Sequence, residues 1–138
     1  MLSSKGCLAT VKYAYRAACY FMLMKEMKLK FVEIRACYKD GGELTRELFV
    51  IICGLNPDNR IACGEWMGYC LTNKYHFPFV LKNENELFFG WEENYYEMTD
   101  LKEKRILEGE YFTISNQPGD PEEFQSTYQI THVTPMVK

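Results

Sequence analysis

The chain has 138 residues, a length that usually makes one domain around one hydrophobic core, so we expect a single domain over residues 1–138. An apolar fraction of 47%, with 15% aromatic and 25% charged residues, is that of a globular protein and excludes a largely disordered chain. The net charge of −3 is unevenly divided: residues 1–75 carry eleven Lys and Arg against seven Asp and Glu, whereas residues 76–138 carry five against twelve.

The N-terminal segment has the periodicity of an amphipathic helix. Apolar side chains recur there every three or four residues, at Leu8, Val11, Tyr15, Ala18, Cys19 and Met22. The apolar run Ala17–Met24 is flanked by charged residues, lacks a small-residue cleavage site of the signal-peptide type, and is too short to span a membrane. We therefore expect a long helix packed on the rest of the domain, no membrane segment, and a cytoplasmic protein.

A hairpin is predicted after this helix. Residues 28–38 alternate apolar and polar side chains, and they lead into Asp40 and Gly41, a dipeptide typical of hairpin turns. Residues 48–54 are β-branched and continuously apolar, as expected of a return strand in the middle of a sheet.

A short helix and a second hairpin are predicted next. Residues 61–73 carry several apolar side chains on a broad face, which we interpret as a short helix. Residues 76–82 and 86–91 read as two strands joined by a turn, and Pro78 restricts the first of them to an edge or a bulge.

The last predicted elements complete an α+β fold. A charged turn or short helix is expected at residues 100–107, and strands are expected at 110–115 and 126–135, separated by the turn-forming sequence Gln117-Pro118-Gly119-Asp120-Pro121. One helix followed by several hairpins predicts an N-terminal helix packed on a mainly antiparallel β-sheet.

No catalytic or cofactor motif is recognisable. The six cysteines include no Cys-x-x-Cys pair, and without an export signal we expect buried thiols instead of disulfides. The glycines match neither a phosphate-binding loop nor a dinucleotide fingerprint, so we predict no metal and no cofactor. One alternative stays open: a small enzyme or RNA-binding module that uses His132, a cysteine and the pair Glu92 and Glu93 in a cleft.

Residues 84–100 are the most unusual part of the chain, because they hold six carboxylates, five large aromatics and no basic residue. Aromatic side chains supply contact area at low entropic cost, and carboxylates steer a positively charged partner. The alternative interpretation is a strand whose aromatics are core residues and whose glutamates face water. We predict a surface for a basic protein partner and no binding of nucleic acid, with these contacts: Glu92, Glu93, Tyr95, Tyr96, Glu97 and Asp100.

The C-terminal sequence resembles the terminal hairpin of many small bacterial immunity proteins. The resemblance lies in the sequences EGEYFTI (108–114) and TYQITHVTP (127–135) and covers under a quarter of the chain. Such proteins accompany contact-dependent growth inhibition and other secreted toxins, are cytoplasmic and non-enzymatic, and often neutralise nucleases with basic clefts. A similar hairpin occurs in RNA-binding barrels of the PUA and ASCH type, but the acidic segment argues against that comparison.

The resemblance and the acidic aromatic segment together predict a non-enzymatic inhibitor. Its function would be to bind and neutralise a cognate basic toxin domain, and the resemblance implies that the toxin is a nuclease. Residues 84–100 would then be expected to cover or approach the active site of the toxin.

Overall fold

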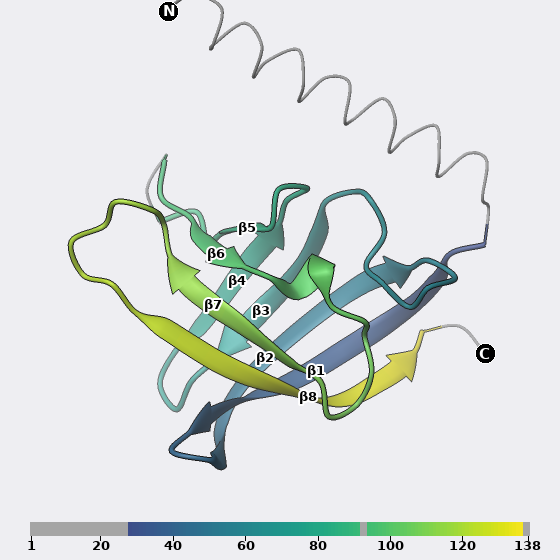
Figure 1. Ribbon diagram of the computed structural model, residues 1–138, viewed down its shortest axis with the longest axis horizontal. Coiled ribbons are helices and arrows are strands. Elements are labelled where there is room, and N and C mark those ends of the chain that lie inside the picture. The colour runs from purple at the N-terminus through teal and green to yellow at the C-terminus, as the bar shows by residue number, and fades with distance from the viewer. Residues whose placement is uncertain (1–27, 92–93, 137–138) are drawn as a thin grey trace, which may run out of the picture.

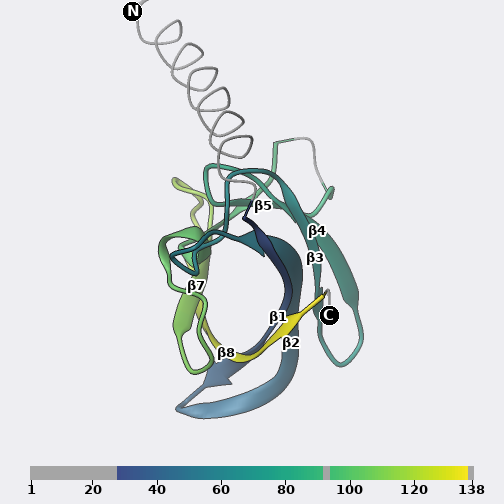
Figure 2. The ribbon, with the colours of Figure 1, turned by 90° about the vertical axis from the view of Figure 1, so that its right-hand side faces the viewer.

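The computed structural model describes residues 28–91 and 94–136. These residues form eight strands, along which inward and outward side chains alternate. The strands are β1 (Lys30–Asp40), β2 (Glu43–Leu55), β3 (Trp66–Leu71), β4 (His76–Leu81), β5 (Glu86–Phe88), β6 (Glu97–Thr99), β7 (Tyr111–Asn116) and β8 (Gln125–Pro135). Each strand pairs antiparallel with the next, and β8 returns to pair with β1, so the sheet is a closed barrel (Figures 1 and 2).

The predicted α+β class is therefore wrong. In the part of the chain that the structure describes, the only helix is a short 3-10 helix, η1 (Leu101–Glu103). A sheet that closes on itself buries its inner face without a covering helix, and this removes the reason for packing a helix on it. The predicted N-terminal helix falls within residues 1–27, outside the described residues.

Side chains from the inner face of the wall fill the barrel. Inward and outward residues alternate along each strand, as the pleat requires. Phe49 lies at the centre, stacked on Phe79 with ring centroids 4.9 Å apart and edge-on to Phe112 at 5.0 Å. The largest fully buried side chains are Phe49, Phe112, Ile34, Ile51, Leu81, Leu87, Leu101 and Ile130.

Both predicted hairpins are confirmed, and the helix predicted at residues 61–73 is wrong. Residues 66–71 of this stretch form β3, which pairs with β2 from Leu48↔Leu71 to Ile52↔Met67. Apolar residues on both faces of β3 concealed its period of two. Gly68 fixes the close packing of this strand, because a Cβ there would lie 2.2 Å from the carbonyl oxygen of Val50.

The two ends of the barrel differ. At the end that we call the cap end, the β2–β3 loop and η1 cover the core with the buried residues Ile61, Leu101 and Ile106. The Ile106 amide donates to the Asn59 carbonyl oxygen at 2.7 Å, which joins the two covering segments. The opposite end, which we call the loop end, is formed by the β1–β2, β3–β4, β5–β6 and β7–β8 connections and lies at the left of Figure 1.

Candidate functional site

The loop end gathers four connections that are far apart in the sequence. In an up-and-down barrel, alternate connections fall at the same end, so residues 38–47, 70–77, 89–97 and 115–127 become neighbours there, with residues 92–93 left undescribed. Loops positioned by a rigid scaffold are common places for binding residues. The loop end is therefore a candidate binding site.

Large apolar side chains are exposed in each of these connections. Tyr75 in the β3–β4 turn is 61% exposed, and Trp91, which follows β5, is 51% exposed. Leu44 is exposed at the start of β2 and Phe124 in the β7–β8 connection, and Leu71 is exposed at the end of β3. Five of the eleven large apolar side chains that are exposed in the described residues lie at this end, and the other six lie elsewhere on the barrel. Exposed apolar groups in neighbouring loops, within a polar surround, are typical of an interaction surface.

Acidic residues outnumber basic ones at the same end. The described residues of the four connections include seven carboxylates, Asp40, Glu43, Glu47, Glu97, Asp120, Glu122 and Glu123. The basic residues in the same ranges are Lys39, Arg46 and Lys74. The loop end is thus negative as well as partly apolar, which suits a cationic binding partner.

Four aromatic side chains lie together between the start of β4 and the start of β6, and we call them the aromatic rim: Phe77, Phe89, Trp91 and Tyr95. Trp91 is at its centre. It stacks on Phe89 with centroids 4.5 Å apart and an interplanar angle of 11°, meets Phe77 edge-on at 5.3 Å, and contacts Tyr95 at 5.6 Å. Phe89 in turn meets the core residue Phe79 at 5.9 Å, so the rim is continuous with the barrel interior.

Glu97 stands beside this rim with its side chain on the inner face of the wall. It is in register with Leu87 on β5 and Asn116 on β7, both of which are buried. The Tyr95 hydroxyl donates a hydrogen bond to Glu97 Oε2 at 3.1 Å. Burial raises the pKa of Glu97, and the hydrogen bond from Tyr95 opposes that rise. None of the described Lys, Arg or His side chains forms an ion pair with Glu97.

Further polar groups lie behind Glu97 on the inner face. Cys70 is in register with the core residue Phe49, and Tyr128 with the core residue Phe112. The pKa of Cys70 is raised to about 12, chiefly by burial and to a smaller extent by the negative charges of Glu97 and then Glu47. Burial also raises the pKa of Tyr128, with smaller contributions from the same groups. This end of the interior therefore has a negative potential, whereas the middle is apolar.

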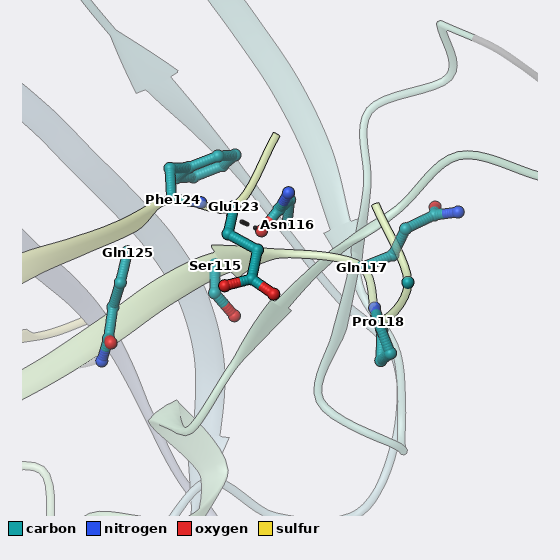
Figure 3. A pocket seen from close by; sticks show the side chains of 8 residues that line it. Ser115, Asn116, Gln117, Pro118, Glu123, Phe124 and Gln125 are labelled. Atoms are coloured by element: carbon teal, nitrogen blue, oxygen red, sulfur yellow. Dashed lines mark hydrogen bonds between the residues drawn. The ribbon is translucent and has the colours of Figure 1, made fainter. Parts of the chain in front are cut away.

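An open pocket of about 520 Å³ lies in the β7–β8 connection (Figure 3), and one of its lining residues, Asn116, is in register with Glu97. Its lining residues are Ser115, Asn116, Gln117, Pro118, Gly119, Glu123, Phe124 and Gln125. Asn116 holds the loop in place, because its side-chain amide donates to the Glu122 carbonyl and its Oδ1 accepts from the Phe124 amide at 3.2 Å. The pocket is thus a fixed feature of the β7–β8 connection and brings Glu123 to the loop end.

No family model, curated protein or solved structure matches the chain. Within residues 28–91 and 94–136, no helix has the length and apolar character needed to cross a bilayer.

The structure separates the predicted contact residues from one another. Tyr95 and Glu97 come together at the loop end, as described above. Tyr96 stacks on Phe88 with centroids 5.5 Å apart, and its amide donates to Gln117 Oε1 at 3.2 Å. Asp100 lies towards the cap end, where its Oδ1 accepts from the Thr113 amide at 2.8 Å. Glu92 and Glu93 lie outside the described residues.

Two groups of the alternative cleft can be placed. His132 is exposed near the cap end of β8, with Nδ1 3.0 Å from Thr131 Oγ1, whereas Cys70 faces inward at the loop end. Cys37, Cys53 and Cys70 are free thiols, as expected from the sequence, but only Cys53 of these is fully buried. Cys63 is disulfide-bonded, so the expectation of a thiol is wrong at that position.

Several residues of the loop end were not predicted from the sequence. Glu47 had a usable signal, because it continues the inward alternation of Phe49, Ile51 and Cys53 along β2. Tyr75 reaches the aromatic rim through Phe77, with ring centroids 5.7 Å apart, and Phe124 lies in the β7–β8 connection, which composition did not single out.

Proposed function

We propose that this protein is a non-enzymatic binding protein whose loop end binds a basic protein partner. The supporting observation is that four connections place exposed aromatic and apolar side chains among seven carboxylates at one end of a closed barrel. In the specific form that the sequence resemblance suggests, the protein is an immunity protein and the partner is a toxin domain with a basic cleft.

The two kinds of residue have different roles in this proposal. The carboxylates attract a positively charged surface over a distance of about one Debye length, roughly 8–10 Å at physiological salt, and so increase the association rate. The exposed rings, above all Tyr75 and Trp91, supply the apolar contact that slows dissociation. A partner lacking positive charge would gain only the apolar contact with the rings and not the electrostatic attraction.

A pair of charge-reversal variants tests the proposal. The loop-end variant carries Glu43→Lys, Glu122→Lys and Glu123→Lys, all at exposed positions. Its matched control carries the same three changes at the cap end, at the exposed residues Asp58, Glu103 and Glu108. Both variants have the same net charge, so a difference between them reports the position of the charges.

Each tagged protein is used to capture partners from native lysate at low salt, and the captured protein is then purified for association kinetics. We expect a basic protein that binds the wild type and the cap-end control alike and associates roughly tenfold more slowly with the loop-end variant, by a factor that shrinks as salt is added. Equal binding to both variants, or recovery of RNA as the bound species, would overturn the proposal.

A further inference from the structure

We infer that the aromatic rim and Glu97 together form the anchor site for one arginine side chain of the partner. This inference rests on the proposed function, since it identifies the group at the centre of the proposed interface. It names the guanidinium ion, a planar cation, as the chemical group that the site recognises.

The geometry supplies both interactions that a guanidinium ion makes. Trp91 is half exposed and stacks one face of its indole on Phe89, so a cation would lie over the opposite face, where the ring quadrupole attracts it. Glu97 is joined to the same rim through the hydroxyl of Tyr95. An arginine can stack on an aromatic face and donate to a carboxylate at once, because its donors lie in one plane.

The charge of Glu97 has no counter-ion in the described part of the chain. The three ion pairs there are Arg35–Glu33, Lys82–Glu65 and Lys104–Asp100, and all of them lie away from the rim. Behind Glu97, the inner face adds Glu47 and the neutral groups Cys70 and Tyr128, with no basic side chain among them. A half-buried carboxylate in such surroundings gains from a cation that arrives from outside.

Arginine fits these surroundings better than lysine. A guanidinium ion is more weakly hydrated than an ammonium ion. It therefore loses less hydration free energy when it leaves water for a site lined by Phe77 and Phe89. Lysine offers a compact charge with no planar surface to place against Trp91. The site should therefore rank arginine above lysine and should not bind an uncharged side chain of similar length.

Titration of the full-length protein with three capped amino acids tests this ranking without any mutation. The probes are the Nα-acetyl amides of arginine, lysine and norleucine, and the readout is the set of indole N–H resonances of the two tryptophans. We expect arginine to shift the Trp91 resonance with a dissociation constant on the order of millimolar, lysine to bind more weakly, and norleucine to cause no shift. The resonance of Trp66, at the cap end, should stay unchanged.

Two variants and one control connect the shift to the named residues. We expect Glu97→Gln to weaken arginine binding roughly tenfold and Trp91→Leu, which keeps apolar bulk without a ring, to abolish it. Glu108→Gln removes one carboxylate at the cap end and should leave binding unchanged. An absent arginine shift in the wild type, equal shifts with norleucine, or undiminished binding by Glu97→Gln would each overturn the inference.

This outcome is separable from that of the proposed function. A wild type that binds its basic protein partner in a salt-dependent manner, yet gives no arginine shift, would leave the loop-end interface standing and remove the arginine anchor. If the partner bound the loop-end and cap-end charge-reversal variants equally well, the proposed interface at the loop end would be wrong.

Discussion

Gly68 occupies a position on β3 where no side chain fits. A Cβ there would lie 2.2 Å from the Val50 carbonyl oxygen and 2.7 Å from Phe79 Cζ, and the first of these neighbours is backbone of the adjacent strand. Overpacking a core costs about 1–3 kcal/mol, and a backbone atom has little room to move aside. We expect Gly68→Ala to lower the free energy of unfolding in urea by at least about 2 kcal/mol.

The neighbouring position provides the control for this prediction. Met67 points outward and is 71% exposed, so Met67→Ala should change the free energy of unfolding by no more than about 0.5 kcal/mol. Similar small losses for both variants would mean that β3 does not approach β2 as closely as described.

Glu97 makes the stability of the protein depend on pH in a predictable direction. Burial holds its pKa above the ordinary value of 4.5, so the folded state binds more protons than the unfolded state at pH values between the two. Its contribution to the free energy of unfolding is therefore favourable at low pH and is lost as the pH rises from 4.5 through the pKa of the folded state. A glutamine at this position does not titrate.

We accordingly expect Glu97→Gln to gain stability relative to the wild type as the pH rises through this interval, and the difference to become constant above it. Urea unfolding of both proteins from pH 4 to pH 8 measures the difference. A gain that appears on acidification instead would show that the carboxylate is stabilised in the folded state.

The site was only partly predictable at the level of single residues. Tyr95 and Glu97 were selected because carboxylates and aromatics alternate in this segment, and they do lie side by side. The inward direction of Glu97 could not be predicted, because β6 is three residues long and too short to show a period of two. Asp100 carries the same charge but accepts a backbone hydrogen bond from Thr113, a role that composition cannot reveal.

At the scale of elements, two missed strands account for the wrong fold class. The hairpins and the C-terminal strands were predictable from alternation and turn residues, whereas β3 and β6 were not. An open sheet of the six predicted strands would need a helix to cover its inner face. Once β3 fills the place between β2 and β4, and β6 the place between β5 and β7, the wall can close and no cover is needed.

Lys102 joins three covering segments at the cap end. Its Nζ donates to the Gly64 carbonyl oxygen at 2.9 Å and to Asn83 Oδ1 at 3.3 Å, and Asn83 Oδ1 also accepts from the Gly64 amide at 2.7 Å. Burial lowers the pKa of Lys102 to about 8, and the charges of nearby groups such as Glu84 oppose this shift. Removing the ammonium group would take this donor from the part-buried Gly64 carbonyl oxygen, whereas Asn83 Oδ1 would still accept from the Gly64 amide.

We expect Lys102→Ala to cost about 1–3 kcal/mol in the free energy of unfolding at pH 7, because the Gly64 carbonyl oxygen would lose a charged hydrogen-bond donor. Lys104→Ala is the matched control: its ion pair with Asp100 is 3.9 Å long and partly exposed, and such pairs contribute about 0–1 kcal/mol. Chemical denaturation of the two variants gives both values, and a loss for Lys104→Ala as large as that for Lys102→Ala would contradict this account of the cap end.

The barrel wall as a whole is uneven in the extent of its pairing. β1 pairs with β2 and β8 along most of its length, from Lys30 to Asp40 on one side and from Val32 to Lys39 on the other. In contrast, β5 meets β4 only at Val80↔Phe88 and Leu81↔Leu87, and it meets β6 only at two positions as well. The weakly paired section of the wall carries Glu97 and leads directly to the aromatic rim.

This difference predicts two levels of protection against amide hydrogen exchange. Amides of β1, β2 and β8 should exchange only when the whole barrel unfolds, because no local opening frees them from two long neighbours. Amides of β5 and β6 should exchange faster through local openings that break few hydrogen bonds. Urea dependence of the exchange rates separates the two cases, since global unfolding exposes much more surface than a local opening does.

Binding at the loop end should then stabilise β5 and β6, the weakly paired section of the wall, against local opening. A cation held between Trp91 and Glu97 connects the end of β5 to the start of β6, so it stabilises the closed wall by RT ln(1 + c/Kd), where c is the free ligand concentration, against any open state that lacks the site. We expect saturating arginine amide to slow exchange in β5 and β6 by the same factor as in β1 and β8, because local opening of β5 and β6 and global unfolding both abolish the site. Exchange in β5 and β6 that stays unchanged while exchange in β1 and β8 slows would show that the local opening leaves the site intact.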